Sequence, residues 1–227
     1  MTDAFPPVIT IDGPSGTGKG TIAAKLAETL GFANLDSGAL YRALAWAVDS
    51  QGVNPRDTAA LRACVDQAQV QLIHGKVFCN TRDVTQAIRQ EKIGNLASVI
   101  SSNPLVRQRL LQLQRAQRQW PGLVTDGRDM GSVVFPDATV KFFLTASPEE
   151  RAKRRYKQLK GRGIDVSLRD VETEMTNRDR QDSDRDISPL HPADGSVVVD
   201  TTSLDVAAVF DKIIEIVRFH LPAQRCK

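Results

Sequence analysis

The chain has 227 residues with 30 basic and 27 acidic side chains, and its mean hydropathy is −0.27. These proportions are typical of a soluble globular protein with one large domain, or one domain that carries an insertion. A net charge of +3 is too small to indicate wholesale nucleic-acid binding, and the longest apolar run, residues 43–48, is too short to span a bilayer. The first ten residues contain no Lys or Arg, so we expect no secretory signal, no membrane contact and a cytoplasmic location.

The cysteines and histidines are few and dispersed. Cys64, Cys79 and Cys226 form no close pair, and the three histidines lie far apart in the sequence. A zinc site needs clustered ligands, and a disulfide framework needs paired cysteines. We therefore predict free thiols in a reducing compartment.

The N-terminal part of the chain alternates strand and helix patterns. Residues 8–11 read as a buried strand, and a helix is expected from about 19 to 30, ending at Gly31. A short strand over 32–35 and a helix over 37–48 follow. This alternation predicts an α/β fold in which helices cover a parallel sheet.

The middle of the chain breaks this alternation. Residues 70–72 and 77–79 alternate about His74-Gly75, which predicts a β-hairpin. Helical patterns cover 58–69 and the segment from Thr85 onward, with a break at Pro104. We interpret residues 53–100, approximately, as a small α/β insertion in a core formed by about 8–52, 101–150 and 186–220.

The C-terminal part returns to apolar strands, at residues 123–126, 140–144 and 197–199. Ser147 followed by proline and then by Glu150 is a strong helix start, because the serine can cap the first turn. A last helix is expected over 206–217.

Residues 13–21, GPSGTGKGT, connect the first expected strand and helix. Glycines let consecutive N–H groups turn inward around an anion, and the positive end of the helix strengthens that field. The lysine would reach the β- and γ-phosphates, and a hydroxyl would face Mg²⁺, directly or through water. The hydroxyl comes one residue later than in the general motif. A plain glycine-rich turn is the alternative, but the setting favours a nucleoside triphosphate bound by Gly13, Pro14, Ser15, Gly16, Thr17, Gly18, Lys19, Gly20 and Thr21.

Residues 151–163, RAKRRYKQLKGRG, carry seven basic side chains and no acid. Such a run can be a solvated helix face or an RNA contact. Beside a bound triphosphate it can also be a lid whose arginines stabilise the charge on the transferred phosphoryl group. We favour a lid, over about 151–185.

Two arginines bracket a carboxylate in the acidic and basic segment 177–190. Arg178, Asp182 and Arg185 follow at intervals of four and three, which would place them on one helix face. Surface ion pairs are one interpretation, since such pairs stabilise a helix only slightly. The other is a ligand with both phosphate and hydroxyls, such as a sugar phosphate or nucleotide.

Polar residues also follow two expected strands, at the sheet edge where α/β proteins bind ligands. TDGRDMG provides Asp126 and Arg128, and LDSGALYRAL provides Asp36, Ser37 and Arg42. An alcohol acceptor would need a carboxylate base, which either aspartate could supply. A phosphate acceptor is already an anion and needs no base, so the excess of arginine favours phosphate.

Over about residues 8–217 the chain closely resembles bacterial cytidylate kinases. The resemblance lies in the order and spacing of five segments: GPSGTGKGT, LDSGALYRAL, TDGRDMGSVVFPDA, RDRQDSDRDISPL and VVVDTTSL. DGRDMG and DSGALYR are more specific than the phosphate loop, which many families share. The resemblance implies a P-loop nucleoside monophosphate kinase fold with a core, a lid and a nucleotide-binding insertion. It also implies transfer of phosphate from ATP, with Mg²⁺, to CMP or dCMP. One departure is Ala87, where family members commonly have an acid.

The resemblance also implies residue roles. Lys19 and the lid arginines, Arg154 and Arg155, would act on the transferred group. The acceptor phosphate would be bound by Ser37, Arg42, Arg128 and Arg185, the cytosine by Ser98, Arg107 and Asp129, and the ribose by Arg178 and Asp182. Asp36 and Asp126 are further candidates for substrate contact.

Two other functions remain as alternatives at this point. One is a P-loop kinase for another small acceptor, such as UMP or a shikimate-like alcohol. The other is an ATP-binding regulatory module that contacts RNA, which an aromatic content of only 5% disfavours because stacking platforms would be scarce. We expect a monomer that binds small molecules and no nucleic acid.

Overall fold

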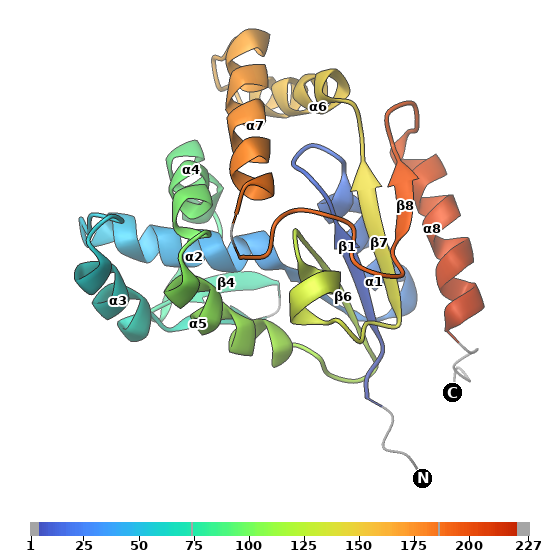
Figure 1. Cartoon of the computed structure of the whole chain (residues 1–227), viewed down its shortest axis with the longest axis horizontal. Coiled ribbons are helices and arrows are strands. Elements are labelled where there is room, and N and C mark those ends of the chain that lie inside the picture. Colours follow the sequence, from blue (N-terminus) through green and yellow to red (C-terminus); the bar gives the residue numbers. More distant parts are fainter. Residues whose placement is uncertain (1–4, 74, 186, 222–227) are drawn as a thin grey trace. The chain divides into compact units, whose positions relative to one another are not determined.

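A computed structural model describes residues 5–73, 75–185 and 187–221 (Figure 1). The chain forms two compact units, one of Met1–Leu35 with Gln117–Lys227 and the other of Asp36–Ala116. Asp186 and Cys226, and His74 of the expected hairpin turn, lie outside the described residues. No helix among the described residues is long and apolar enough to cross a membrane.

The larger unit contains a five-stranded sheet in the order β2-β6-β1-β7-β8. β1 pairs in parallel with both β6 and β7, and β7 pairs in parallel with β8. Every residue of β1 and β6 is buried, as expected for central strands covered on both faces. The prediction of a parallel sheet is therefore confirmed. The strands are β1 (Val8–Asp12), β2 (Ala33–Asp36), β6 (Leu123–Gly127), β7 (Val140–Thr145) and β8 (Val197–Asp200).

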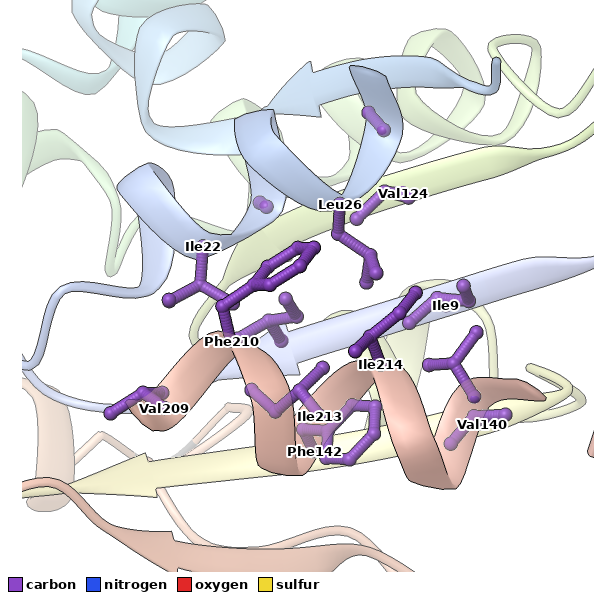
Figure 2. Close-up of a cluster of buried hydrophobic side chains, with 14 of the residues drawn as sticks. Ile9, Ile22, Leu26, Val124, Val140, Phe142, Val209, Phe210, Ile213 and Ile214 are labelled. Carbon is purple, nitrogen blue, oxygen red and sulfur yellow. The ribbon is translucent and has the colours of Figure 1, made fainter. Parts of the chain in front are cut away.

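Two helices pack on this sheet and form the main core with it. α1 (Lys19–Leu30) and α8 (Val206–His220) point their apolar side chains at the strands, as Figure 2 shows. Ile22 and Leu26 of α1 meet Phe210 of α8 above the sheet. α1 has the bounds expected from the sequence, and Gly31 ends it with a positive φ of 65°. The loop before α1 is thus fixed at both its ends, by a buried strand and by a packed helix.

A second, smaller core joins α6 (Pro148–Gly161) to α7 (Leu168–Ser183). Ala152 and Leu159 of α6 pack against Val171 and Met175 of α7. The expected cap at the start of α6 is confirmed, since the Ser147 hydroxyl accepts a hydrogen bond from the Glu150 N–H at 3.2 Å.

The smaller unit combines helices with a three-stranded sheet in the order β3-β4-β5. β3 and β4 form the expected antiparallel hairpin. The helix α2 contacts all three other helices of the unit. The elements are α2 (Ser37–Ser50), α3 (Thr58–Gln67), β3 (Val70–Ile73), β4 (Lys76–Cys79), β5 (Arg82–Asp83), a 3₁₀ turn η1 (Ala87–Arg89), α4 (Glu91–Ile100) and α5 (Pro104–Arg115).

The expectation of a continuous helix from Thr85 onward is wrong, because only the 3₁₀ turn Ala87–Arg89 precedes α4, which begins at Glu91. The Asp83 carboxylate accepts from the Thr85 N–H, and the Thr85 hydroxyl accepts from the Val77 N–H. These bonds hold residues 83–85 against β4. They compete with the helical hydrogen bonds that this segment could otherwise form.

The smaller unit also contains two buried free thiols, Cys64 in α3 and Cys79 in β4. Burial raises the pKa of Cys79 to about 11, with a smaller contribution from the neighbouring Cys64. The prediction of free thiols is confirmed for these two residues.

Candidate functional site

The glycine-rich loop between β1 and α1 fits closely against its surroundings. Gly13 has a φ of 144°, and a β-carbon there would lie 2.2 Å from the Leu144 carbonyl oxygen of β7, so only glycine fits. The Thr17 hydroxyl and the Lys19 ammonium both donate to the Pro14 carbonyl at 3.1 Å. Lys19 is also the first residue of α1. The loop therefore places a cation and the N–H groups of a helix start together, as a polyphosphate site requires.

Oxygen ligands for a divalent cation lie at the same helix start. The buried Asp126 lies near the end of β6, and a β-carbon built on Gly20 would be 3.7 Å from its Oδ2. Thr21 is the next residue and is exposed. Mg²⁺ usually takes one or two carboxylates together with substrate phosphates, rather than a cage made only of protein. The residues present fit such an ion. Among the described residues, no group of three or more His, Cys, Asp or Glu side chains could hold a metal ion by itself.

Asp182 lies between two arginines near this loop. Its carboxylate accepts from Nε of Arg128 at 2.8 Å and pairs with Arg185 through its other oxygen. Arg128 also donates to the Ser15 hydroxyl at 2.8 Å. Burial opposes ionisation of Asp182, but the charges of Arg128 and Arg185 outweigh it and hold the pKa of Asp182 below its usual value. Three buried or nearly buried charges are thus held next to the phosphate loop.

The structure brings Asp182 and Arg185 together, but not because the two residues lie on one face of a helix. α7 ends at Ser183, so Arg185 lies beyond the helix and turns back toward Asp182. Arg178 is on α7 and lowers the pKa of Asp182 through its charge. The expectation that all three lie on one helix face is wrong for Arg185, although the grouping itself is confirmed.

Asp12, the last residue of β1, was not among the expected site residues. Its two carboxylate oxygens accept from the N–H groups of Met130 and Gly131 at 2.9 and 2.8 Å. These groups begin a single π-helical turn, Met130–Val134, directly after Asp129. Burial raises the pKa of Asp12 to about 6, and the nearby Asp129 charge adds to the effect, although both N–H groups oppose it. The only signal in the sequence was a carboxylate at the end of an otherwise uncharged strand.

The arginines of α6 differ in their surroundings. Arg154 donates to the Thr201 carbonyl at 2.6 Å and to the Thr201 hydroxyl at 3.1 Å, in the segment between β8 and α8. Thr201 in turn donates to the Thr17 carbonyl of the phosphate loop. Arg155 contacts Gln158 on the same helix. Arg151, which sequence reasoning did not single out, is buried and donates to the Ser15 carbonyl at 3.3 Å.

The smaller unit holds the other expected site residues. Asp36 caps α2 by accepting from the Ala39 N–H, and the next residue, Ser37, is buried. Arg42 of α2 donates to the Ile88 carbonyl at 3.1 Å.

The expected cytosine contacts Ser98 and Arg107 lie on the two helices that flank the turn at residues 101–103, Ser98 on α4 and Arg107 on α5. The Ser101 hydroxyl donates to the Ser98 carbonyl, and the Arg107 guanidinium donates to the Ser101 carbonyl. Ser101 is therefore hydrogen-bonded to both expected residues, to the backbone of Ser98 and to the side chain of Arg107.

The fold and the loop define the class of the protein. A parallel sheet, a glycine-rich loop that ends in a lysine at a helix start, and buried arginines beside it are typical of a P-loop phosphotransferase. The family model for cytidylate kinase matches residues 9–219, so the chain belongs to the cytidylate kinase family.

Curated relatives agree with this assignment. The chain is 50% identical over 218 residues to a protein of Coxiella burnetii named cytidylate kinase, covering 93% of this chain and 92% of that one. It is 51% identical over 214 residues to a cytidylate kinase of Stutzerimonas stutzeri, covering 92% and 93% of the two chains. A cytidylate kinase of Nitrosococcus oceani is 50% identical over 214 residues, covering 92% and 94%.

Proposed function

We propose that this protein transfers the γ-phosphate of ATP to CMP or dCMP, giving ADP and CDP or dCDP. The observation that carries the proposal is the arginine pair, Arg128 and Arg185, that Asp182 holds beside the phosphate loop. Bringing two anionic phosphates together requires cations that offset their repulsion. Cations held in position before the substrate binds need not reorganise during the transfer.

The donor side of the reaction belongs to the loop and α6. Backbone N–H groups of the loop 13–21, in which only Pro14 has none, bind the β- and γ-phosphates, and Lys19 follows the charge of the transferred group. When bound with the nucleotide, Mg²⁺ neutralises part of the phosphate charge, and Thr21 and Asp126 would hold it, directly or through water. Arg154 and Arg155 belong to a lid over about 151–185, which stabilises the charge on the equatorial oxygens.

The acceptor side needs no general base, because the oxygen of a nucleoside monophosphate that attacks is already an anion. Arg128 and Arg185 bind this phosphate, and Arg178 with Asp182 contacts the ribose. The resemblance to the family assigns Ser37 and Arg42 to the same phosphate, and it assigns residues 53–100 to nucleotide binding.

Asp129 is the proposed reader of the base. Cytosine presents an exocyclic amine that a carboxylate can accept from, whereas uracil presents a carbonyl there. Ser98 and Arg107 would satisfy the acceptor edge of the ring. The competing role for Asp129, orienting Arg128, is less attractive because Asp182 already pairs with that guanidinium.

A coupled assay of ADP release tests the proposal, with ATP and one of five acceptors: CMP, dCMP, UMP, AMP or shikimate. We expect turnover with CMP and dCMP, and at least a ~10²-fold lower kcat for Lys19→Met, comparable to the loss of one preorganised charge-stabilising donor. The proposal would be overturned if ADP were released only with shikimate, or if none of the five acceptors supported ADP release. We also propose that the protein is a monomer, which sedimentation of the purified protein would test, and that it is cytoplasmic, which cell fractionation would test.

A further inference from the structure

Arg151 is the only buried basic residue of the run 151–163. Its Nε donates to the Ala146 carbonyl at 3.1 Å, and one terminal nitrogen pairs with Asp179 of α7 at 2.6 Å. The same nitrogen donates to the Ser15 carbonyl at 3.3 Å. A buried guanidinium is unfavourable unless several acceptors compensate it, and here three segments of the chain supply them. Arg151 therefore ties the phosphate loop to both α6 and α7.

Ser15 is held from two sides. Arg128 donates to its hydroxyl, and Arg151 donates to its carbonyl. Each arginine is anchored by a carboxylate of α7, Arg128 by Asp182 and Arg151 by Asp179. The two aspartates are three residues apart and so lie on one side of the helix. α7 thus holds one residue of the phosphate loop through two separate Arg–Asp pairs.

This arrangement fixes the orientation of one peptide group. In a trans peptide the carbonyl and the following N–H point in opposite directions. Because the Arg151 guanidinium holds the Ser15 carbonyl, the Gly16 N–H points away from that guanidinium. Gly16 itself has a φ of +82°, and a β-carbon there would lie 2.9 Å from Cβ of Arg151, so the loop packs directly on α6.

We propose that Arg151 and Asp179 form a positioning pair that fixes the Ser15–Gly16 peptide for binding of the donor phosphates. Neither residue needs to contact the nucleotide for this role. The inference rests on the proposed function, since it assumes that residues 13–21 bind a nucleotide. It predicts that loss of Arg151 weakens donor binding selectively, because the loop loses this support while the pairs of Asp182 with Arg128 and Arg185 remain.

Calorimetric titration with ADP and, separately, with CMP tests this inference without turnover. Arg151→Met keeps the side-chain stem and removes every donor, and we expect about 10-fold or weaker ADP binding, as for the loss of a hydrogen bond from a charged donor. CMP binding should stay within about 2-fold, which is well below that effect. The matched control is Arg218→Met, the same change at an exposed residue of α8, which should alter neither affinity.

Two further variants keep the test decisive if Arg151→Met does not fold. Arg151→Lys keeps the charge but not the fork of donors, and should weaken ADP binding less than Arg151→Met does. Asp179→Asn should weaken it in the same direction, because Arg151 loses its anchor.

The outcomes separate the two proposals. If the wild-type protein binds no ADP, the proposed function fails. If it binds ADP and the Arg151 variants bind equally well, or lose ADP and CMP affinity alike, the positioning role is overturned while the proposed function stands. An Asp179→Asn variant that has a lower melting temperature and unchanged ADP binding would also overturn the role of the pair.

Discussion

Replacing Asp182 with asparagine is the most direct test of the charge cluster. The Asp182 side chain is only 2% exposed, and the Arg128 and Arg185 side chains are 15% and 7% exposed. The substitution removes the carboxylate that both guanidiniums share and leaves two nearly buried positive charges close together. Removing one partner of a buried ion pair costs about 3–5 kcal/mol. Because asparagine retains one acceptor oxygen, we expect the lower end, about 3 kcal/mol of unfolding free energy.

Urea unfolding followed by circular dichroism at pH 7 measures this loss. The matched control is Asp184→Asn, the same change two residues along at an exposed position, where an effect below about 0.5 kcal/mol is expected. Inorganic phosphate should stabilise Asp182→Asn more than it stabilises the wild type, because an anion can replace the lost carboxylate between the arginines.

The pH dependence gives an independent check of the same reasoning. The two arginines hold the folded pKa of Asp182 below 3.8, so its contribution to stability is present above pH 3.8 and is lost as the pH falls through the folded pKa. The difference between wild type and Asp182→Asn should therefore be constant near neutrality and shrink in acid. Equal stabilities for Asp182→Asn and Asp184→Asn at pH 7 would refute the argument that a buried, shared carboxylate holds the two arginines.

Three further predictions address the base, the lid and the end of β1. Asp129→Ala should lower kcat/KM for CMP while UMP is nearly unaffected, narrowing the discrimination by ~1–3 kcal/mol; a parallel loss for both substrates in the coupled assay would count against base reading. Arg155→Ala should lower kcat more than it weakens CMP binding, and unchanged turnover would remove this arginine from the lid. Asp12→Asn removes a carboxylate whose pKa is raised from 3.8 to about 6. Because the pKa is raised, the unfolding free energy of the wild type, measured relative to Asp12→Asn, is highest below pH 3.8 and falls as the pH rises through about 6. The expected fall is roughly 3 kcal/mol, at 1.36 kcal/mol per pKa unit. Urea unfolding at pH 4 and pH 7 would measure this change, and a difference that does not vary with pH would contradict it.

Local signals made the larger unit's framework predictable from the sequence. The strands at its centre are continuous apolar runs, and α1 has glycines on both sides, so their positions follow from short-range patterns. The same holds for the start of α6, where serine, proline and glutamate act within one turn. The phosphate loop belongs to this group, because its glycines and lysine are contiguous.

The parts that could not be predicted depend on contacts between distant residues. Asp12 binds N–H groups more than 100 positions away, and Arg151 reaches Ser15 across a similar separation. Nothing adjacent in sequence distinguishes Arg151 from the six exposed or half-buried basic residues of its run. The segment after Thr85 was misassigned for the same reason, since its bonds to β4 replace the helix that its apolar pattern favours.

The two buried thiols allow local opening of the smaller unit to be measured by chemical labelling. A thiol reacts with alkylating agents as the thiolate, and a pKa of about 11 for Cys79 leaves almost none of it near neutral pH. Alkylation of Cys64 or Cys79 must therefore wait for transient exposure of that residue, and its rate at these two positions would measure opening of Asp36–Ala116. Peptide mapping by mass spectrometry would follow α3 and β4 separately. Equal labelling rates would mean that this unit opens as one cooperative block, and unequal rates would reveal which of the two elements detaches first.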